Sequence, residues 1–355
     1  MSAIETAHGV GSTLISNLFV KLPYPDAQFN GQTIIVTGSN TGLGFEASKH
    51  LCRLGVEKLI MGVRTLEKGE AARSEILEIT KRDPATIEVW QIDMESYDSI
   101  KRFADRAASL PRLDGLVANA GILTTVFGLA EDNERTITVN VVATFLLCLL
   151  LLPRLQSSAA ATGVTPHVVI PNSALHYTSP TKELDPSKSI FGTLNNANEA
   201  DMANRYPLSK LLVIYIIREL ALKLATSDHA LVVFNTPNPS FCKSQLMRES
   251  PSAGLRMAER LLARTTEEGS RVLVHGLAAG AESNGQYLTN CRVHRYVPTP
   301  GEHFHNASAS ATRLTNECSP STLVTGTKGQ QIQKKVFQEL VEKLEKISPG
   351  ISASF

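Results

Sequence analysis

The residues best suited to chemistry are a tyrosine and a lysine near the start of a long apolar stretch. Tyr206 and Lys210 stand in NRYPLSKLLVIYIIRELALKL, residues 204–224. Positions four apart lie on one face of a helix, so the ammonium can sit close to the phenol. A free tyrosine titrates at about pH 10, so a nearby cation is needed to stabilise its phenolate near neutrality. Without further motifs, the pair could equally be two residues of an amphipathic helix.

A glycine-rich turn provides a second motif, because TGSNTGLG at residues 37–44 follows an expected strand and opens an expected helix. Gly38 permits the tight turn, Gly42 lets the backbone approach a pyrophosphate, and Gly44 allows the helix to pack closely on the strand. The helix N-terminus then faces the anion. The pattern predicts dinucleotide binding; the alternative is a glycine-rich turn without a ligand.

The end of the second expected strand indicates which dinucleotide is bound. An NAD site would place an acidic residue there for the ribose hydroxyls. This chain places Arg64 there, 20 residues beyond Gly44, with Lys68 one turn further. A guanidinium can bind the 2′-phosphate of NADP through two parallel hydrogen bonds, and Lys68 adds a second positive charge. We therefore expect NADP(H), the alternative being two surface cations at the start of a solvated helix.

The elements that must position these residues alternate between short Val- and Ile-rich runs and amphipathic stretches. The expected strands are residues 32–37, 58–63, 86–92, 113–119, 167–172 and 230–236. The expected helices are residues 43–54, 66–81, 96–109, 132–152 and 205–225. Strict β/α alternation predicts an α/β fold, a single Rossmann-type doubly wound parallel sheet with helices on both faces. Ligands then bind at the carboxyl ends of the strands.

Composition excludes several classes of function. The 355 residues carry 35 Lys and Arg against 34 Asp and Glu, a net charge of +1, so no global field recruits nucleic acid or an anionic membrane. Five cysteines are odd in number and contain no CxxC, which indicates reduced thiols in an intracellular, cytoplasmic setting. The first 25 residues lack the pattern of a signal peptide.

Two features suggest a membrane span and a metal site, but neither fits the pattern that such a feature requires. The apolar run at 137–152 has 16 residues, contains Asn140 and ends before Pro153, whereas a membrane span needs roughly 20. We expect a helix buried on nearly all sides and no membrane span. The group Cys291, His294, His303 and His305 fits no zinc spacing, so we expect no metal site.

The chain divides into three parts by composition. Residues 1–30 form an N-terminal extension, residues 31–300 the NADP-binding catalytic domain, and residues 301–355 a C-terminal loop and docking helix. A polar insertion at 178–204 lies between the motifs of the catalytic domain, where a loop can carry specificity. Its apolar residues could contact a substrate, or the insertion could be a solvated excursion; the residues concerned are Tyr177, Phe191, Leu194 and Met202.

The order and spacing of TGSNTGLG, NAG (119–121) and YPLSK (206–210) resemble the classical short-chain dehydrogenase/reductase family over residues 31–300. The C-terminal helix resembles that of retinol-dehydrogenase-like and fungal secondary-metabolite members. The resemblance implies a catalytic set of Asn140, Ser173, Tyr206 and Lys210. It implies cofactor contacts from Gly38, Asn40, Gly42, Leu43, Gly44, Arg64, Lys68, Asp93, Met94, Asn119, Ala120, Gly121, Tyr206, Lys210, Pro239 and Ser240.

The resemblance also implies roles within the catalytic set. Tyr206 would protonate a carbonyl oxygen while NADPH delivers hydride to carbon. Ser173 would hold the substrate oxygen, unless it merely caps a turn at the end of its strand. Asn140 would sit in a kinked buried helix, its backbone carbonyl holding a water behind the lysine; the alternative is a buried polar residue satisfied within the core.

Three positions depart from the family pattern. Ser240 follows Pro239 where the family often has glycine, Ser244 stands in place of threonine, and Asn172 replaces a frequent serine. None of these changes removes a proton donor. We therefore expect an NADPH-dependent reductase or dehydrogenase that acts on a bulky, hydrophobic carbonyl or alcohol compound. The alternative is an NADP-binding protein of the same fold with a non-redox or cofactor-sensing role.

The two most apolar helices also lead to an expectation about assembly. Residues 137–152 and 205–222 are apolar over more of their circumference than one sheet face can cover. The surplus predicts a homodimer in which the same helices of two subunits meet, as the family resemblance also implies. Docking on a membrane, or cover by the N-terminal 30 residues, would hide the same surface.

Overall fold

A mostly parallel sheet of eight strands forms the centre of the computed structural model, which describes residues 11, 15–243, 246, 259–294 and 321–355. Its order is β10-β9-β8-β7-β4-β1-β2-β3, and only β10 runs antiparallel to its neighbour. The strands are β1 (Thr33–Thr37), β2 (Lys58–Val63), β3 (Ile87–Gln91), β4 (Gly115–Val117), β7 (His167–Val169), β8 (Val233–Asn238), β9 (Tyr287–Thr289) and β10 (Arg292–His294). This topology confirms the predicted fold class.

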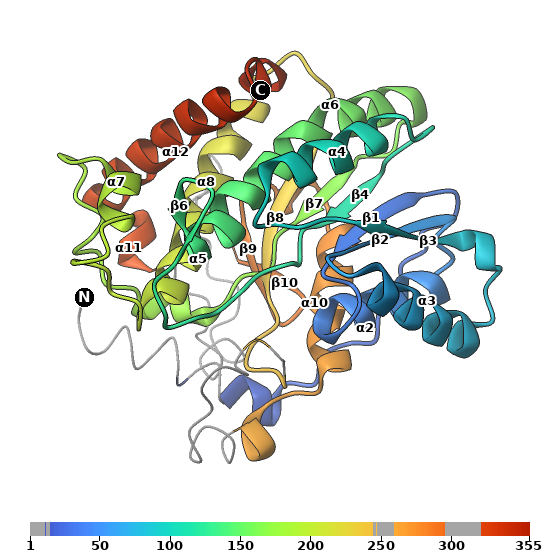
Figure 1. The fold of residues 1–355 in the computed structure, drawn as a ribbon. Helices are drawn as coiled ribbons and strands as arrows, with labels where there is room; N and C mark the ends of the chain where they lie inside the picture. The colour runs from blue at the N-terminus through green and yellow to red at the C-terminus, as the bar shows by residue number, and fades with distance from the viewer. Residues whose placement is uncertain (1–10, 12–14, 244–245, 247–258, 295–320) are drawn as a thin grey trace, which may run out of the picture.

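Helices cover both faces of the sheet (Figure 1). One face carries α2 (Gly42–Arg53), α3 (Leu66–Thr80) and α10 (Thr266–Ala278), whose apolar residues form one core cluster with the sheet. The other face carries α4 (Tyr97–Ala108), α6 (Thr144–Thr162) and α8 (Arg205–Leu224), which form a second cluster. Burial of all five residues of β1 follows from this double cover.

The long apolar run is a continuous helical rod inside the fold. It consists of α5 (Arg135–Ile137), the π-helical segment η2 (Thr138–Ala143) and α6. Over residues 135–162 it is long and apolar enough to cross a membrane, yet 89% of its most apolar window is buried inside the protein. The π-helical turn falls on Asn140, where the sequence led us to expect a kinked buried helix.

A C-terminal helix covers much of the apolar surface that suggested a dimer. Helix α12 (Thr327–Ile347) packs against α8, with Gln333 linking them: Arg218 Nε donates to Gln333 Oε1 at 2.8 Å, and Gln333 Nε2 donates to Glu219 Oε1 at 2.7 Å. Its buried apolar residues include Ile332, Val336, Leu340 and Leu344. Part of the surplus apolar surface of α8 is therefore covered within the chain, which removes that part of the argument for a homodimer and leaves the family resemblance.

The 178–204 insertion is anchored beside α12. Its helix α7 (Ile190–Leu194) is capped by the Glu339 carboxylate, which accepts from Ile190 N at 3.0 Å and Phe191 N at 3.1 Å. Phe191 and Leu194 are buried in the core. The insertion is described throughout, and none of its residues lines the pocket that Tyr206 and Lys210 line. The sequence left substrate contact and a solvated excursion open; Phe191 and Leu194 do neither here, because both side chains pack into the core.

The described part of the N-terminal extension joins the fold. Leu22 and Phe29 are buried in the cluster beneath α2 and α10. At the other end of the chain, residues 301–320 of the expected C-terminal loop lie outside the described residues, as do His303, His305 and Ser244. In the part of the chain that is described, no group of three His, Cys, Asp or Glu residues could hold a metal ion.

Candidate active site

A pocket of about 310 Å³ lies at the carboxyl ends of the parallel strands. It is the edge at which an open α/β sheet binds its ligands. Thirteen of the residues expected from the sequence line it: Gly38, Asn40, Gly42, Leu43, Arg64, Asp93, Met94, Asn119, Ala120, Gly121, Tyr206, Lys210 and Pro239. The structure thus brings the glycine-rich turn and the Tyr–Lys pair to one cavity.

The glycines of the first turn are required for two steric reasons. Gly38 and Gly42 have φ of 64°, a left-handed backbone that favours glycine. A Cβ built at Gly44 would lie 2.5 Å from Gly38 O and 2.5 Å from Asn119 Nδ2, so the helix could not approach the strand with any side chain there. Gly44 does not itself line the pocket; it allows the close packing predicted for it.

Helix α2 begins in a way that suits an anion. Its N-cap residue Thr41 makes no side-chain capping bond, and its first turn contains no acidic residue. Helix α10 differs, since Thr265 caps it and Glu267 and Glu268 stand in its first turn. Backbone N–H groups at an uncapped helix start carry a partial positive charge and can bind a phosphate.

The end of β2 is positively charged but also holds a carboxylate. Arg64 Nη1 lies 3.6 Å from Glu95 Oε1, and the Arg64 side chain is 65% exposed. Arg135 donates two hydrogen bonds to the same carboxylate, at 2.8 and 2.9 Å. Lys68 is exposed and does not line the pocket. Of these two predicted cations, Arg64 therefore lines the pocket and Lys68 does not.

The NAG motif ties two strand ends together. Asn119 Nδ2 donates to Thr37 O at 3.0 Å and to Gly38 O at 3.3 Å, and Ala120 N donates to Thr37 Oγ1 at 3.0 Å. These bonds link the end of β4 to the end of β1. The motif thus shapes the turn as well as lining the pocket.

Asn140 supports the pocket from behind. Its Oδ1 accepts from Ile122 N at 2.9 Å, while its Nδ2 donates to Ile122 O at 2.9 Å and to Ser209 Oγ at 3.1 Å. It does not line the pocket. Its side chain is thus satisfied in the core, joining the segment after NAG to helix α8.

The Tyr–Lys pair lies on one face of α8, as the spacing predicts. Lys210 Nζ is 5.4 Å from the centre of the Tyr206 ring and donates to Pro171 O at 2.8 Å. Burial lowers the pKa of Lys210 to about 8 and raises the pKa of Tyr206 above its ordinary value, although part of the phenol faces the pocket. Desolvation is the cause of both shifts, and it favours the neutral form of each group.

Ser173 and Asn172 follow β7 side by side and do different things. Ser173 Oγ accepts from Leu175 N at 3.2 Å, which makes it the N-cap of the short helix η3 (Ala174–Thr178). It does not line the pocket, whereas Asn172 does. Asn172 Nδ2 donates to Lys210 O at 3.2 Å and to Thr236 Oγ1 at 3.0 Å. The asparagine that replaced the frequent serine thus ties β7, α8 and β8 together.

Ser240 adopts a backbone conformation that suits glycine. Its φ is 67°, and its N–H donates to Asn238 Oδ1 at 2.9 Å. A left-handed residue with a side chain costs roughly 1–3 kcal/mol unless its surroundings hold it. Ser240 does not line the pocket, although Pro239 beside it does.

Sequence reasoning missed nine lining residues. They are Thr41, Gly62, Ile92, Glu95, Ile122, Val139, Pro171, Asn172 and Leu246. Most directly flank residues that were named, so the rule that ligands bind at strand ends could have found them. Leu246 carried no such local signal.

Known proteins resemble this chain over nearly its whole length. A family model for short chain dehydrogenases matches residues 32–165. The chain is 40% identical over 346 residues to the short chain dehydrogenase/reductase dmxR8 of the fungus Cryptosporiopsis, covering 96% of this chain and 99% of that protein. It is 44% identical over 283 residues to the short chain dehydrogenase atnD of Emericella nidulans, covering 78% of this chain and 90% of that one.

Solved structures share the fold. A protein from Mycobacterium paratuberculosis superimposes with a TM-score of 0.60 at 22% identity, covering 93% of this chain and 97% of that one. A candidate NAD(P)-dependent gluconate 5-dehydrogenase from Beutenbergia cavernae, with NADP bound at low occupancy, gives 0.53 at 21% identity over 75% of this chain and 97% of that one. The extent of the fungal matches shows that this chain belongs to the short-chain dehydrogenase/reductase family, and thus to the oxidoreductases that use NAD(P).

Proposed function

We propose that the protein is an NADP(H)-dependent oxidoreductase that interconverts a carbonyl and an alcohol on a bulky, hydrophobic small molecule. One observation carries this proposal: Tyr206 and Lys210 line the same pocket as the glycine-rich turn and Arg64. A proton donor therefore stands in the cavity that has the features of a dinucleotide site.

The residues present fit a bound dinucleotide. A Cβ built at Gly42 would meet no atom of the described residues within 4 Å, which leaves room for a pyrophosphate beside the backbone. The N–H groups at the start of α2 would hold that pyrophosphate. Arg64 would bind the 2′-phosphate of NADP, and the segment Asp93–Met94 would lie beside the adenine.

The chemistry divides between the cofactor and the chain. The nicotinamide of NADPH supplies a hydride when it is bound. Tyr206 holds a proton at its phenol oxygen and donates it to the substrate oxygen, in keeping with its raised pKa. Lys210 supplies the charge that stabilises the phenolate left behind. Ser173 Oγ accepts from Leu175 N and does not line the pocket, so its hydroxyl could bond the substrate oxygen only if the substrate reaches past Asn172.

Apolar side chains support the choice of substrate. Ile122, Val139 and Leu246 line the pocket together with Tyr206. A cavity lined by such residues with a few polar groups favours a hydrophobic ligand held by its oxygen. We therefore propose a bulky ketone, aldehyde or secondary alcohol.

The test is direct. The protein is incubated with NADPH and a panel of hydrophobic ketones and aldehydes while the absorbance of the reduced nicotinamide is followed. Consumption that depends on the ketone or aldehyde supports the enzyme. The non-redox alternative would be favoured if the protein binds NADPH but consumes none with any compound of the panel, and if NADP reacts with none of the matching alcohols.

Two predictions about the setting of the protein stay predictions. A cytoplasmic location rests on the odd number of cysteines without a CxxC. A homodimer rests on the family resemblance, since α12 covers α8 within the chain. The mass in light scattering at micromolar concentration tests the second.

A further inference from the structure

The loop after β8, residues 239–243, borders the catalytic end of the pocket. Pro239 lines the pocket together with Tyr206 and Lys210. The sheet order places β8 beside β7, on the opposite side of β1 from β2 and β3, after which Arg64 and Asp93 stand. Given the proposed dinucleotide, this loop therefore lies at the nicotinamide end and Arg64 at the adenine end.

The N-terminal extension holds this loop through one asparagine. Ser240 Oγ donates to Asn17 Oδ1 at 2.6 Å, and Asn17 Nδ2 donates to Phe241 O at 2.8 Å and to Leu262 O at 2.9 Å. The oxygen and the nitrogen of the Asn17 side-chain amide therefore both bond to segments more than 220 positions away in the sequence. The contact stabilises the left-handed Ser240, the position at which the sequence departs from the family's glycine.

Arg264 holds the loop and the extension together. Its backbone pairs with the loop, since Arg264 N donates to Phe241 O at 2.9 Å and Lys243 N donates to Arg264 O at 3.0 Å. Its guanidinium reaches the extension, where Nη2 donates to Val20 O at 2.9 Å and Ser16 O at 3.1 Å.

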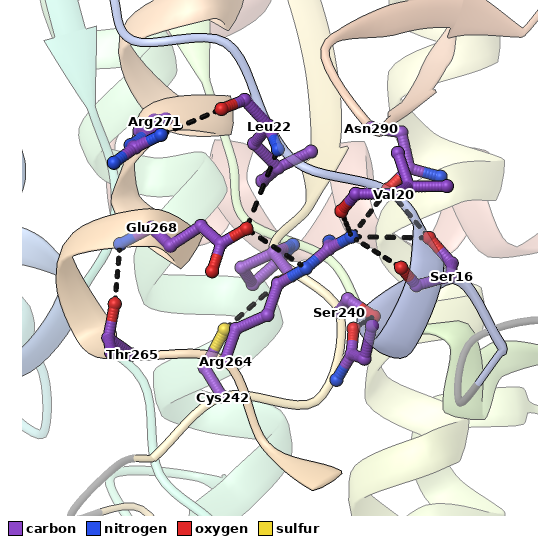
Figure 2. Close-up of polar contacts among 12 residues, drawn as sticks. Ser16, Val20, Leu22, Ser240, Cys242, Arg264, Thr265, Glu268, Arg271 and Asn290 are labelled. Atoms are coloured by element: carbon purple, nitrogen blue, oxygen red, sulfur yellow. Dashed lines mark hydrogen bonds and ion pairs between the residues drawn. The ribbon is translucent and has the colours of Figure 1, made fainter.

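The guanidinium of Arg264 is enclosed by these contacts. The same Nη2 donates to Asn290 Oδ1 at 3.1 Å, and Nε lies 3.8 Å from Glu268 Oε1. Figure 2 shows the guanidinium directed at the short helix that carries Ser16 and at Val20, which follows that helix. Arg264 is only 4% exposed, and loss of its guanidinium would remove a charge-assisted donor from Val20 O, Ser16 O and Asn290 Oδ1.

We propose that Asn17 and Arg264 are positioning residues that hold the 239–243 loop against the nicotinamide half of the cofactor, so that the N-terminal extension is part of the cofactor site. The inference rests on the proposed function. A segment distant in sequence sets the position of Pro239, and through it the affinity for the nicotinamide ring and its alignment with Tyr206.

The test compares two ligands that differ only in the ring. Binding of NADPH and of 2′-phospho-ADP-ribose, which lacks the nicotinamide, is measured by calorimetry for the unmutated protein and for Asn17→Ala. We expect Asn17→Ala to weaken the binding of NADPH about tenfold, which is the net contribution of a few neutral hydrogen bonds. The binding of 2′-phospho-ADP-ribose should weaken by less than about twofold. A merely structural role would weaken both ligands alike.

Three further variants strengthen the comparison. Ser240→Ala removes only the hydroxyl that reaches Asn17 and should act in the same direction, by about threefold. Gln28→Ala is the matched control, because Gln28 is an exposed amide of the same extension whose Nε2, among the described residues, donates only to Asp26 O, at 3.5 Å. It should change neither affinity. Arg264→Met should resemble Asn17→Ala, and the other variants carry the test if it does not fold.

The outcomes separate the inference from the proposed function. Equal weakening of both ligands by Asn17→Ala, or no weakening of NADPH, would overturn the positioning role while leaving the enzyme intact. Failure of the unmutated protein to bind either ligand would overturn the proposed function and the inference that rests on it.

Discussion

The two ends of the pocket are built from different kinds of sequence. The phosphate-binding end comes from one contiguous stretch, residues 37–64, and depends on glycine backbone and the start of α2. The catalytic end assembles from segments around residues 17, 140, 172, 206 and 240 and depends on side-chain hydrogen bonds between them. We infer that the first end controls affinity for the cofactor and that the second controls turnover.

The sharpest way to break this comparison is Tyr206→Phe. The change keeps the ring and its packing but deletes the proton that the carbonyl must receive, so turnover should fall by about a hundredfold or more. Cofactor affinity should stay within a few fold, because one hydrogen bond contributes roughly 0.5–1.5 kcal/mol. Steady-state rates and NADPH titration measure the two effects. Unchanged NADPH consumption with an accepted substrate would show that Tyr206 is only a helix residue.

Arg64→Asp addresses the other end. Loss of a charge-assisted contact to the 2′-phosphate, worth roughly 1.5–3 kcal/mol, should weaken NADPH about ten- to a hundredfold and spare or improve NADH. Its matched control is Lys68→Ala, since Lys68 is exposed and does not line the pocket. That variant should change NADPH affinity by less than about twofold. Equal affinity of the unmutated protein for NADPH and NADH would contradict the selection by Arg64.

Two glycine variants sharpen the account of the phosphate-binding end. Gly44→Ala places a methyl group 2.5 Å from Gly38 O, so it should lower the stability of the protein without cofactor by roughly 1–3 kcal/mol. Gly42→Ala meets open space but retains φ of 64°, which costs roughly 1–2 kcal/mol. Its methyl group would project where the pyrophosphate would lie, so Gly42→Ala should weaken the binding of NADPH more than Gly44→Ala does. Thermal denaturation should show both variants destabilised, and NADPH titration should show the larger loss of affinity in Gly42→Ala. A larger loss of affinity in Gly44→Ala would contradict this assignment.

The smallest effect is a dependence on pH. Burial lowers the pKa of Lys210 to about 8, so the ammonium loses its proton as pH rises through that value. Without the charge the phenolate is less stable, and kcat/KM for reduction should be about half its plateau at pH 8 and should fall further above it. Lys210→Arg keeps its charge across this range and should lack the decline. A decline that persists in Lys210→Arg would assign it to another group.

Much of the fold could be predicted because its signals are local. Six strands and the helices around them follow from alternating Val-rich and amphipathic runs, each carrying its own periodicity. The strands β9 and β10 were missed, since three residues each are too few to show a period. Helix α10 was missed as well, and its contacts with α2 and β7 mark it as part of the cover of one sheet face.

The sequence by itself determined the parts of the site whose spacing carries their meaning. Gly38, Gly42 and Gly44 are required by backbone angles and by one close approach, and Tyr206 and Lys210 share a face because a helix repeats every 3.6 residues. Such rules act within a few residues of the chain. They predict the same geometry wherever the motif occurs.

Only the tertiary structure decided which distant segments meet. Helix α12 covers α8, where the apolar pattern alone suggested a second subunit, and the 178–204 insertion packs beside α12 instead of lining the pocket. Asn17 reaches Ser240 across 223 positions through a single amide. A polar side chain in a short helix has no periodicity to reveal its partner, because the partner is set by how the surrounding elements pack.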